Sequence, residues 1–565
     1  MTVEERNVGD YEELYRILPE ARYIKSAMTL NKTYYRYSSD QNNAVGTVFP
    51  NNQVVKFTIP CSDNTLISLS ESWLDISGIL KLYKGGVNMA PSSDGSVFKF
   101  YSQMKQFAKI GENWIFNCIN KINLYIGGAL VHSVSTPMAL SKFIKIHYKN
   151  DHDIKNGEET LHGYMSLTKP PVMEPFYIGL NPTFLKTSEL FGSQNETYTF
   201  IQKKEGEDYY PDIDFTYMLK LSDILPGVET LKPIFGQSIV LEMMMESDGY
   251  NNINIIGTND APLCDTIKIN NFNQFNFMAV TYLLNVDMKE KLKQVYSKTQ
   301  IEIIDDIGYY NLSLTGMSEN QQLNLKCPLN LKFESDFVSL QLPQFTANTG
   351  DLKENFVGKG VKEANFMLHN NNDLRFMNIQ NIEVYADSQL IYSKNYATKQ
   401  ITANLETNPD LYAISTVATD KTENGTFKNV ITYSFNDAYH LMKECRYCCG
   451  RTEEGAVSYN DFLSTCFCID IPMAAFTHIS TQAQLQINIT FGEGMKGSAT
   501  EKQLLINSSC MSKNTTVIDQ LRVIQKSKIA LVFKGMDSCE VKTIEHSFDN
   551  EIYISDESKG NEVKA

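Results

Sequence analysis

The sequence lacks the features that mark membrane-spanning, secreted and nucleic-acid-coating proteins. No apolar run approaches the ~18 residues that a helix needs to cross a bilayer, and one of the longest, 277–286, is far shorter. The N-terminus has no basic-then-apolar secretory signal. Lys and Arg number 51 against 66 Asp and Glu, a net charge of −15, so neither a broad basic surface nor sequence-specific nucleic-acid binding is expected.

Disulfide and helical signals are equally weak. The 11 cysteines are scattered and odd in number, too dilute for a disulfide-framed protein, which favours folding in a reducing, soluble compartment. Long helical patterns are rare. The composition, 42% hydrophobic and 21% charged, is that of a folded protein. At ~150 residues per domain, 565 residues correspond to about four domains, or to two large β-sandwiches.

What is present is a succession of strand patterns separated by turn residues. One helix is expected, at 288–296, and after it a second strand-rich half begins near Ile301. The strands expected before it are 54–59, 66–70, 73–83, 122–126, 129–134, 215–221, 238–245 and 275–286. The chain is therefore predicted to be mostly β.

The two ends of the chain differ from the rest. Residues 1–45 are expected to form an N-terminal arm with a short amphipathic helix, because apolar residues recur at helical spacing over 11–18. The mixed charges of the arm suit a neighbouring protein or a membrane face better than phosphate, and a frayed terminus fits equally well. Residues 546–565 are expected to form an acidic flexible tail.

An internal repeat is the most informative feature. Three segments recur in the same order in both halves, at offsets that fall from 260 to 250 and 245. The pairs are 122–133 with 382–393, 217–225 with 467–475, and 236–244 with 481–489. One match between apolar strands means little, but three in order indicate that a β domain of about 240 residues was duplicated.

Two large antiparallel β units in tandem imply sandwiches or barrels, and eight-stranded jelly rolls suit this size. The fold predicted is all-β: two tandem eight-stranded jelly rolls, at 46–296 and 297–545, with a few short helices. Long polar loops are expected at 149–212, 341–372 and 394–460. Such loops on a rigid core suit a protein that contacts many copies of itself.

Two segments carry a resemblance to a family. NTLISLSESWLDISGILKLY (64–83) and FTYMLKLSDILPGVETLKPIFGQSIVLEM (215–243) resemble the opening and the end of the first jelly roll in double jelly-roll major capsid proteins. The group most similar is that of Maverick/polinton elements, adintoviruses and virophages. Tyr125 and Tyr385 lie in the corresponding hairpins of the two halves. The resemblance spans roughly 50–535, and the loop at 445–468 departs from the family's pattern.

The resemblance implies a structural protein of the virion, not an enzyme. In that family, homotrimers form pseudo-hexagonal capsomers that tile an icosahedral shell around double-stranded DNA. The implied partners are the chain itself, neighbouring capsomers, penton proteins and minor or cement proteins, together with contact to an internal membrane. Synthesis in the host cytoplasm is expected. An acidic net charge fits a capsid wall that does not itself neutralise the charge of the genome.

One cysteine-rich stretch has spacing that could bind zinc. Cys445, Cys448 and Cys449 give CxxCC, and Cys466 and Cys468 follow as CxC, with His440 nearby. Because small buried thiols are common core residues, packing is the favoured interpretation. No metal, cofactor-binding or catalytic residue is therefore predicted.

Other candidate residues also have simpler structural readings. The histidines are scattered and form no HExxH or HxH arrangement. The carboxylate pairs could serve a glycosidase, but neighbouring acids in turns are usually solvated. A methionine run suits core or inter-subunit packing. The residues concerned are His132, His147, His152, His162, Asp305, Asp306, Asp212, Asp214, Met243, Met244 and Met245.

The alternative function is a tandem β-sandwich that binds or hydrolyses carbohydrate. Carbohydrate platforms depend on aromatic faces, and only two tryptophans are present, Trp73 and Trp114, although 30 tyrosines could substitute. No phosphate-loop, dinucleotide-binding or nucleophile-elbow motif occurs in a supporting context. The capsid interpretation therefore leads.

Overall fold

The computed structural model describes the parts of the chain that form the two sandwiches and their connections. The described residues are 31–39, 53–84, 87–88, 114–151, 204–205, 208–209, 212–245, 266–314, 322–330, 335–343, 345–346, 374, 379–404, 416–418, 426–459, 462–463, 466–473, 483–491, 516–517, 520–546, 552–554 and 563–564. The expected helix at 11–18 lies outside them.

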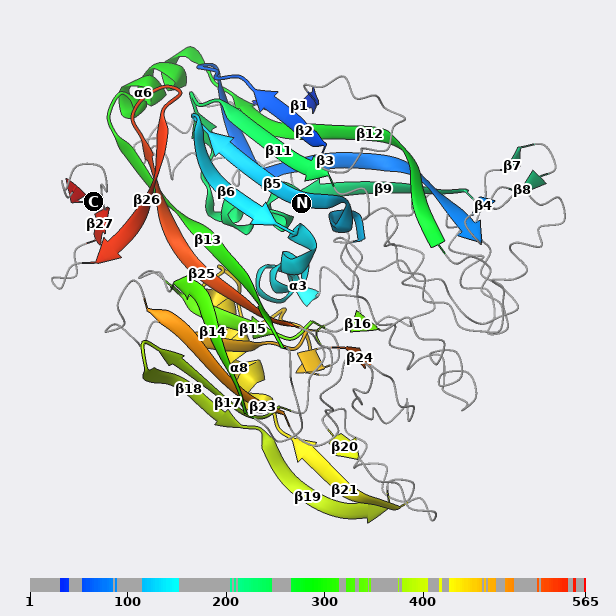
Figure 1. Ribbon diagram of the computed structural model, residues 1–565. Coiled ribbons are helices and arrows are strands. Elements are labelled where there is room, and N and C mark those ends of the chain that lie inside the picture. Colours follow the sequence, from blue (N-terminus) through cyan, green and yellow to red (C-terminus); the bar gives the residue numbers. More distant parts are fainter. Residues whose placement is uncertain are drawn as a thin grey trace.

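Eight strands in two antiparallel sheets build the first sandwich (Figure 1). The first sheet has the order β1 (Asn31–Ser38), β12 (Thr266–Leu283), β3 (Thr65–Lys84), β9 (Asp212–Lys220), and the short β4 (Val87–Asn88) and β10 (Ile234–Phe235) also pair with β3. The second sheet has the order β2 (Val54–Ile59), β11 (Ile239–Met245), β5 (Ile119–Ile126), β6 (Ala129–Ser135).

The second sandwich repeats this arrangement. Its first sheet has the order β13 (Gln300–Ser313), β25 (Gln520–Phe533), β15 (Phe337–Gln341), β22 (Ile469–Pro472), and its second has the order β14 (Gln322–Asn330), β23 (Gln484–Phe491), β17 (Ile379–Ala386), β18 (Gln389–Asn395). The strand β26 (Cys539–His546) pairs with the end of β25, and β27 (Ile552–Ile554) and β28 (Val563–Lys564) follow it.

The order of the strands identifies the fold. When the eight main strands of each sandwich are numbered along the chain, both sandwiches have sheets 1-8-3-6 and 2-7-4-5. This is the order of a jelly roll, in which Greek-key connections carry the chain between two facing sheets. The predicted double jelly roll is therefore confirmed from the strand pairing alone.

The paired hairpins confirm the duplication in detail. β5 and β17, 260 residues apart, have the same alternation of buried and half-buried residues. Both hairpins shift register at the tyrosine, Tyr125 in one and Tyr385 in the other. Both turns have positive φ at two residues, Gly127-Gly128 and Asp387-Ser388, as a two-residue hairpin turn requires. Burying each aliphatic side chain on the inner face of such a strand contributes about 1.5–3 kcal/mol.

One repeat match was off by a single residue. In the strand ladders, Leu241 pairs with Leu124 and Ile487 pairs with Val384, so β11 and β23 correspond at an offset of 246 instead of 245. A shift of one residue exchanges the two faces of a strand. The sequence match placed Val240, which faces outward, on the buried Leu485. Hydrophobic similarity alone did not fix the register.

Several boundaries differ from the expected ones. Residues 66–70 and 73–83 belong to one strand, β3, which is interrupted by a bulge where β12 shifts register. β1 lies within the expected arm, yet it pairs along its whole length with β12. β27 and β28 lie within the expected tail and pair antiparallel with each other.

Three α-helices lie among the described residues. α3 (Pro137–Tyr148) follows β6, and α8 (Asn436–Tyr447) lies between β18 and β22, so each jelly roll has a helix between its fifth and sixth strands. The expected helix at 288–296 is α6 (Val286–Tyr296), which leads from the first jelly roll to β13. None of the described helices is long and apolar enough to cross a membrane.

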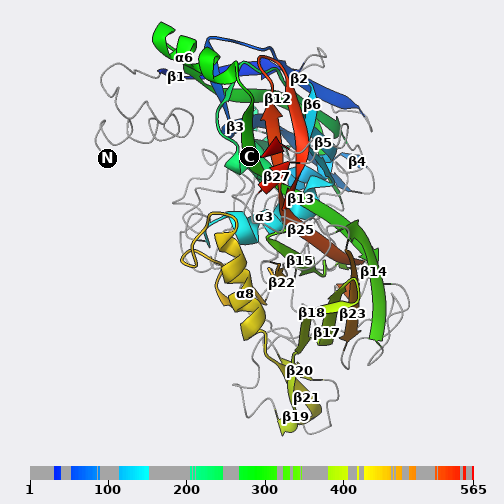
Figure 2. The same ribbon diagram turned by 90° about the vertical axis from the view of Figure 1, so that its left-hand side faces the viewer.

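Small β elements accompany the loops of both jelly rolls. β19 (Ala397–Asn404), β20 (Thr416–Ala418) and β21 (Thr426–Tyr433) form a separate sheet that projects from the second jelly roll (Figures 1 and 2). β16 (Phe345–Thr346) pairs with β24 (Thr516–Val517), and β7 (Lys204–Glu205) pairs with β8 (Asp208–Tyr209). The first of these sheets lies within the expected loop 394–460, which is therefore partly ordered into strands.

The hairpin turn of the first jelly roll offers a test of this packing. A Cβ added to Gly127, at φ +53°, would lie 2.4 Å from Oε1 of Gln237 and 2.9 Å from the Cys539 nitrogen. A Cβ on Gly128 would meet nothing within 4 Å. We expect Gly127→Ala to destabilise the protein by about 1–3 kcal/mol and to lower its melting temperature clearly more than Gly128→Ala. Equal effects would show that the contact is not tight.

Candidate functional site

The helix α3 is buried between the two jelly rolls (Figures 1 and 2). From Ala139 to Tyr148 every residue of the helix is buried, polar residues included. The ring of Phe143 lies 5.9 Å from that of Phe337 on β15, and the ring of His147 lies 5.0 Å from it. A helix of the first jelly roll thus covers the outer face of the 1-8-3-6 sheet of the second.

Arginines of the second jelly roll satisfy the carbonyls of α3. Nη1 of Arg446, on α8, donates to the carbonyls of Ile146 and Lys149. Nε of Arg451 donates to the carbonyl of Tyr148 at 2.9 Å, and Nη1 of Arg522 donates to the carbonyl of Ala139 at 2.6 Å. The last carbonyls of a helix have no partner within it. At this C-terminal end, Arg446 and Arg451 of the neighbouring jelly roll replace water, whereas Arg522 contacts the first turn of the helix.

A buried lysine holds two carboxylates beside the helix. Nζ of Lys526, on β25, lies 2.9 Å from Asp305 and 2.5 Å from Asp336. The hydroxyl of Tyr148 donates to Asp305 at 3.2 Å. Burial raises the pKa of Asp305, and the ion pair with Lys526 opposes that rise. The lysine therefore stabilises the charged form of a carboxylate that burial disfavours.

The C-terminal hairpin forms a second connection between the jelly rolls. Beyond β25, the turn before β26 reaches the 236–238 segment of the first jelly roll. The Asp537 carboxylate accepts from the Ser238 backbone at 2.9 Å, and the Asp537 nitrogen donates to the Gly236 carbonyl at 2.7 Å. Nε2 of Gln237 donates to the Gly535 carbonyl at 2.7 Å. The two jelly rolls are thus joined at both α3 and this turn.

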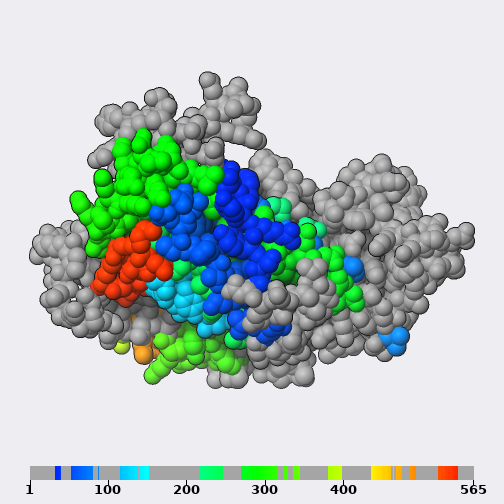
Figure 3. Space-filling model, turned by 90° about the horizontal axis from the view of Figure 1, so that it is seen from above, coloured from blue at the N-terminus to red at the C-terminus, as the bar shows by residue number. Residues whose placement is uncertain are grey.

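The corresponding outer sheet face of the first jelly roll is hollowed instead of covered. A hollow of about 860 Å³ lies over β1, β3 and β12; β1 and β12 are at the surface in Figure 3. Tyr34, 57% exposed, lies 5.7 Å from Trp73, ring to ring. Lys32 forms an ion pair with Glu71 at 2.6 Å. The lining residues are Lys32, Tyr34, Ser70, Glu71, Trp73, Lys220, Glu229, Met278 and Val280.

The structure does not gather the cysteines into the four-thiol arrangement that the spacing could form. Cys445 and Cys449 pack in the hydrophobic cluster that continues from the first jelly roll across the junction, whereas Cys466 and Cys468 pack in the core of the second. Cys448 is exposed, as is His440. Among the described residues, the sole metal-capable group contains just one of these thiols.

That group consists of His147, Cys468 and Asp470, all fully buried between the jelly rolls. Nε2 of His147 lies 2.7 Å from Oδ2 of Asp470, and the Cys468 thiol donates to the same oxygen at 3.6 Å. His147 and Cys468 were candidates on separate grounds, and Asp470 was not among the candidates. Asp470 was missed because it is 323 residues from His147, so no local spacing relates them.

The remaining candidates have structural roles where they are described. His132 is buried, with Nδ1 4.0 Å from the Asp306 carboxylate. Met243 and Met245 lie in the core, and Met244 is half-buried. Two further histidines, His152 and His162, lie outside the described residues, as do the side chains of Asp212 and Asp214 on β9. Trp114 begins a short 3-10 helix (Trp114–Cys118) before β5.

The buried lysine is testable by substitution. Lys526→Met would leave Asp305 and Asp336 without their shared cation, and we expect a loss of about 3–5 kcal/mol in unfolding free energy. The Asp305 pKa would rise further, so the loss should shrink as the pH falls and the carboxyl protonates. As the control, Lys528→Met removes a half-exposed amine 3.7 Å from Asp336 and should cost less than about 1 kcal/mol. Similar losses for both variants would contradict this role.

A second prediction concerns Glu302 on β13. Burial raises its pKa to about 7, and Lys232 offsets this only in part. In the unfolded chain the carboxyl titrates near 4.3, so stability should fall as the pH rises from about 4.5 to about 7 and then level off. Glu302→Gln should flatten this part of the profile of melting temperature against pH. At pH 8 we expect it to stabilise the protein by about 1–3 kcal/mol. An unchanged profile would contradict the prediction.

Comparisons with known proteins found solved structures but no family model and no curated protein that matches. A chain in the cryo-EM structure of the Sputnik virophage is 13% identical over 91% of this chain and 88% of that one, with a TM-score of 0.47. The mavirus major capsid protein is 10% identical over 90% of each chain, with a TM-score of 0.43. A chain of the PBCV-1 virus capsid is 10% identical over 91% and 97%, with a TM-score of 0.42. The strand order itself, and not these distant likenesses, assigns the fold.

Proposed function

We propose that the chain is a major capsid protein whose homotrimers present six jelly rolls as a pseudo-hexagonal tile. The proposal rests on a difference between the two jelly rolls: the outer face of the 1-8-3-6 sheet is covered in one and open in the other. In the second jelly roll the outer face of the 1-8-3-6 sheet is buried under α3. In the first, the equivalent face carries the hollow beside Tyr34 and Trp73.

The strand register shows which residues of the two sheet faces correspond. Across the second jelly roll a row of three paired residues runs Asp470, Ser339, Ile524. Across the first, the corresponding row runs Lys220, Trp73, Met278. Lys220 and Asp470 are also aligned by the sequence repeat at its offset of 250. The row under α3 is fully buried, whereas its counterpart is half-buried.

The helix α8 is suited to cover that face in another copy. It holds the same place in the second jelly roll as α3 holds in the first. Its outward residues include Glu444 and Tyr447, and the hollow contains the cation Lys220. If α8 of one copy packs on the sheet of the next, the contact is head-to-tail. Such contacts generate a ring when the rotation closes, and three copies would supply six jelly rolls.

The proposal extends to the shell that such tiles build. We infer an icosahedral capsid around double-stranded DNA, completed by penton and cement proteins, as the resemblance in the sequence implies. The role is structural and not enzymatic. The carboxylates in the hollow are engaged by cations: Glu71 pairs with Lys32, and Glu229 pairs with Arg451. This arrangement favours an interface over a glycosidase site, which needs two carboxylates flanking a bound sugar.

The proposal predicts a trimer that depends on the Tyr34 face. Light scattering of the purified chain should give three times the monomer mass. Tyr34→Glu should shift the population towards monomer without lowering the melting temperature of the monomer, because a charge would be buried in the contact with α8 of the partner. The control is Val286→Glu, at a 75% exposed position on α6, which should leave the trimer intact. A wild-type chain that stays monomeric at all concentrations would overturn the proposal.

A further inference from the structure

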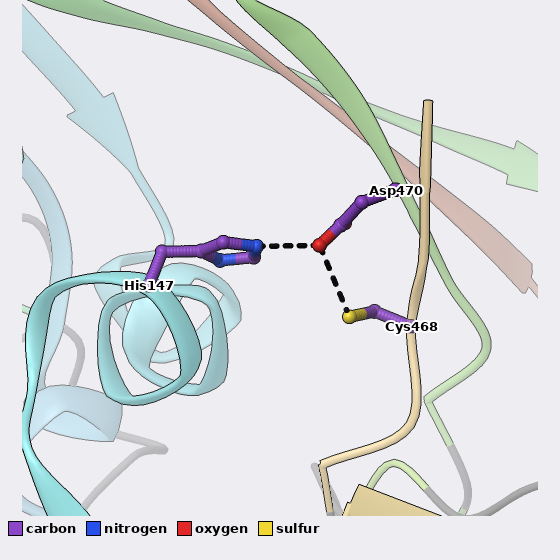
Figure 4. Close-up of side chains that lie close together, drawn as sticks. All are labelled: His147, Cys468 and Asp470. Carbon is purple, nitrogen blue, oxygen red and sulfur yellow. Dashed lines mark hydrogen bonds and ion pairs between the residues drawn. The ribbon is translucent and has the colours of Figure 1, made fainter. Parts of the chain in front are cut away.

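We propose that His147, Cys468 and Asp470 form a buried metal site, best suited to zinc, that joins the two jelly rolls. The site goes beyond the capsid role and does not depend on it. His147 comes from α3 of the first jelly roll, while Cys468 and Asp470 come from the segment 466–473 of the second (Figure 4). One ion would therefore link elements that are more than 300 residues apart in the chain.

The donor atoms already converge. One ligand atom from each residue lies within 4.8 Å of the other two, and Figure 4 shows the imidazole and the thiol both directed at the Asp470 carboxylate. The exposed fractions of the three side chains are all 0%. An imidazole nitrogen, a thiolate and a carboxylate are the ligands that zinc accepts, in a tetrahedron that needs one further donor.

The hydrogen bonds of His147 set up its free nitrogen as a ligand. Nδ1 lies 3.0 Å from the Phe143 carbonyl, which can only accept, so Nδ1 carries the proton. A metal-bound histidine typically donates its second nitrogen to a carbonyl in this way. In the neutral ring, Nε2 then presents a lone pair to Oδ2 of Asp470 at 2.7 Å. Two acceptors at that distance require either an added proton or a cation.

Unsatisfied polar atoms next to these donors also favour a bound ion. Oδ1 of Asp470 is buried and has no hydrogen-bond partner, and neither does Oγ of Ser339. Ser339 lies directly opposite Asp470 in the β15–β22 ladder. A buried acceptor without a partner costs about 1–3 kcal/mol or more when it is charged. The second carboxylate oxygen could supply the fourth ligand, or a metal-bound water could do so and donate to Ser339.

The charges of the three ligands balance those of a divalent ion. Zinc with one thiolate, one carboxylate and a neutral imidazole has no net charge, which lowers the cost of burying it. Binding replaces the thiol proton of Cys468 with the metal ion.

The experiment uses the full-length chain purified without chelator. We expect about one zinc per chain by elemental analysis, and a thiolate-to-metal charge-transfer band when cobalt(II) replaces zinc. Cys468→Ser should abolish the band, and both Cys468→Ser and His147→Gln should weaken zinc binding at least tenfold. Cys466→Ser removes a buried thiol two residues away, outside the group, and should change neither result.

Two results would overturn the site. The first is folded wild-type chain that takes up no zinc when titrated with the metal alone, which would leave an imidazolium–carboxylate ion pair as the arrangement of these residues. The second is a cobalt band that persists in Cys468→Ser. A chelator should lower the melting temperature of the wild-type chain but not that of His147→Gln. These readouts are independent of the oligomeric state, so failure of the site and failure of the trimer can be distinguished.

Discussion

The structure depends on covering one face of a sheet. A jelly roll closes its core between two sheets, but the outer side of each sheet must either carry polar residues to water or find a partner. In the second jelly roll that side carries Phe337 and Ile524, and α3 of the first jelly roll covers it. The cores are therefore continuous: the cluster of the first jelly roll includes residues of β15 and β25.

Because α3 is buried, its polar groups need hydrogen-bond and ion-pair partners within the protein. A helix enclosed on every side leaves its terminal carbonyls and its basic residues without water. Arg446 and Arg451 donate to those carbonyls, Arg522 donates to the carbonyl of Ala139 in the first turn, and Lys149, directly after the helix, pairs with Asp223 at 2.6 Å. The group at His147 belongs to the same junction. Hydrophobic contact between the jelly rolls thus comes with a fixed set of charged donors, which defines their relative orientation.

The fold could be predicted from the sequence because its signals are local. Alternating strands, glycine turns and a repeated hairpin with Tyr125 and Tyr385 were sufficient for a duplicated jelly roll. The register could not be predicted to the residue, since two apolar strands align nearly as well when they are shifted by one position. The segment 137–148 was not predicted as a helix, although Ser141, Lys142 and Lys145 recur at helical spacing. That spacing would place the polar side chains in solvent, whereas the structure buries all three.

The candidate metal site could not be predicted from the sequence, because its residues are not all close together in the chain. Cys466 and Cys468 suggested metal binding through spacing, but the partners of Cys468 come from another domain and from a strand residue two positions away. Only the three-dimensional contact between α3 and β22 brings His147 to Asp470. The buried side of the junction was likewise hidden, since Lys526 reads as an ordinary surface lysine between polar neighbours.

The enclosed helix also has a consequence for the order of events during synthesis. α3 is made early, but Arg522, which donates to its Ala139 carbonyl, lies 383 residues later. At about 5–20 residues per second, the ribosome needs roughly 20–80 s to supply that partner. Throughout this interval the first jelly roll can close its own core while its helix still lacks a cover. The nascent chain would therefore present an apolar and basic helix to chaperones until the last strands emerge.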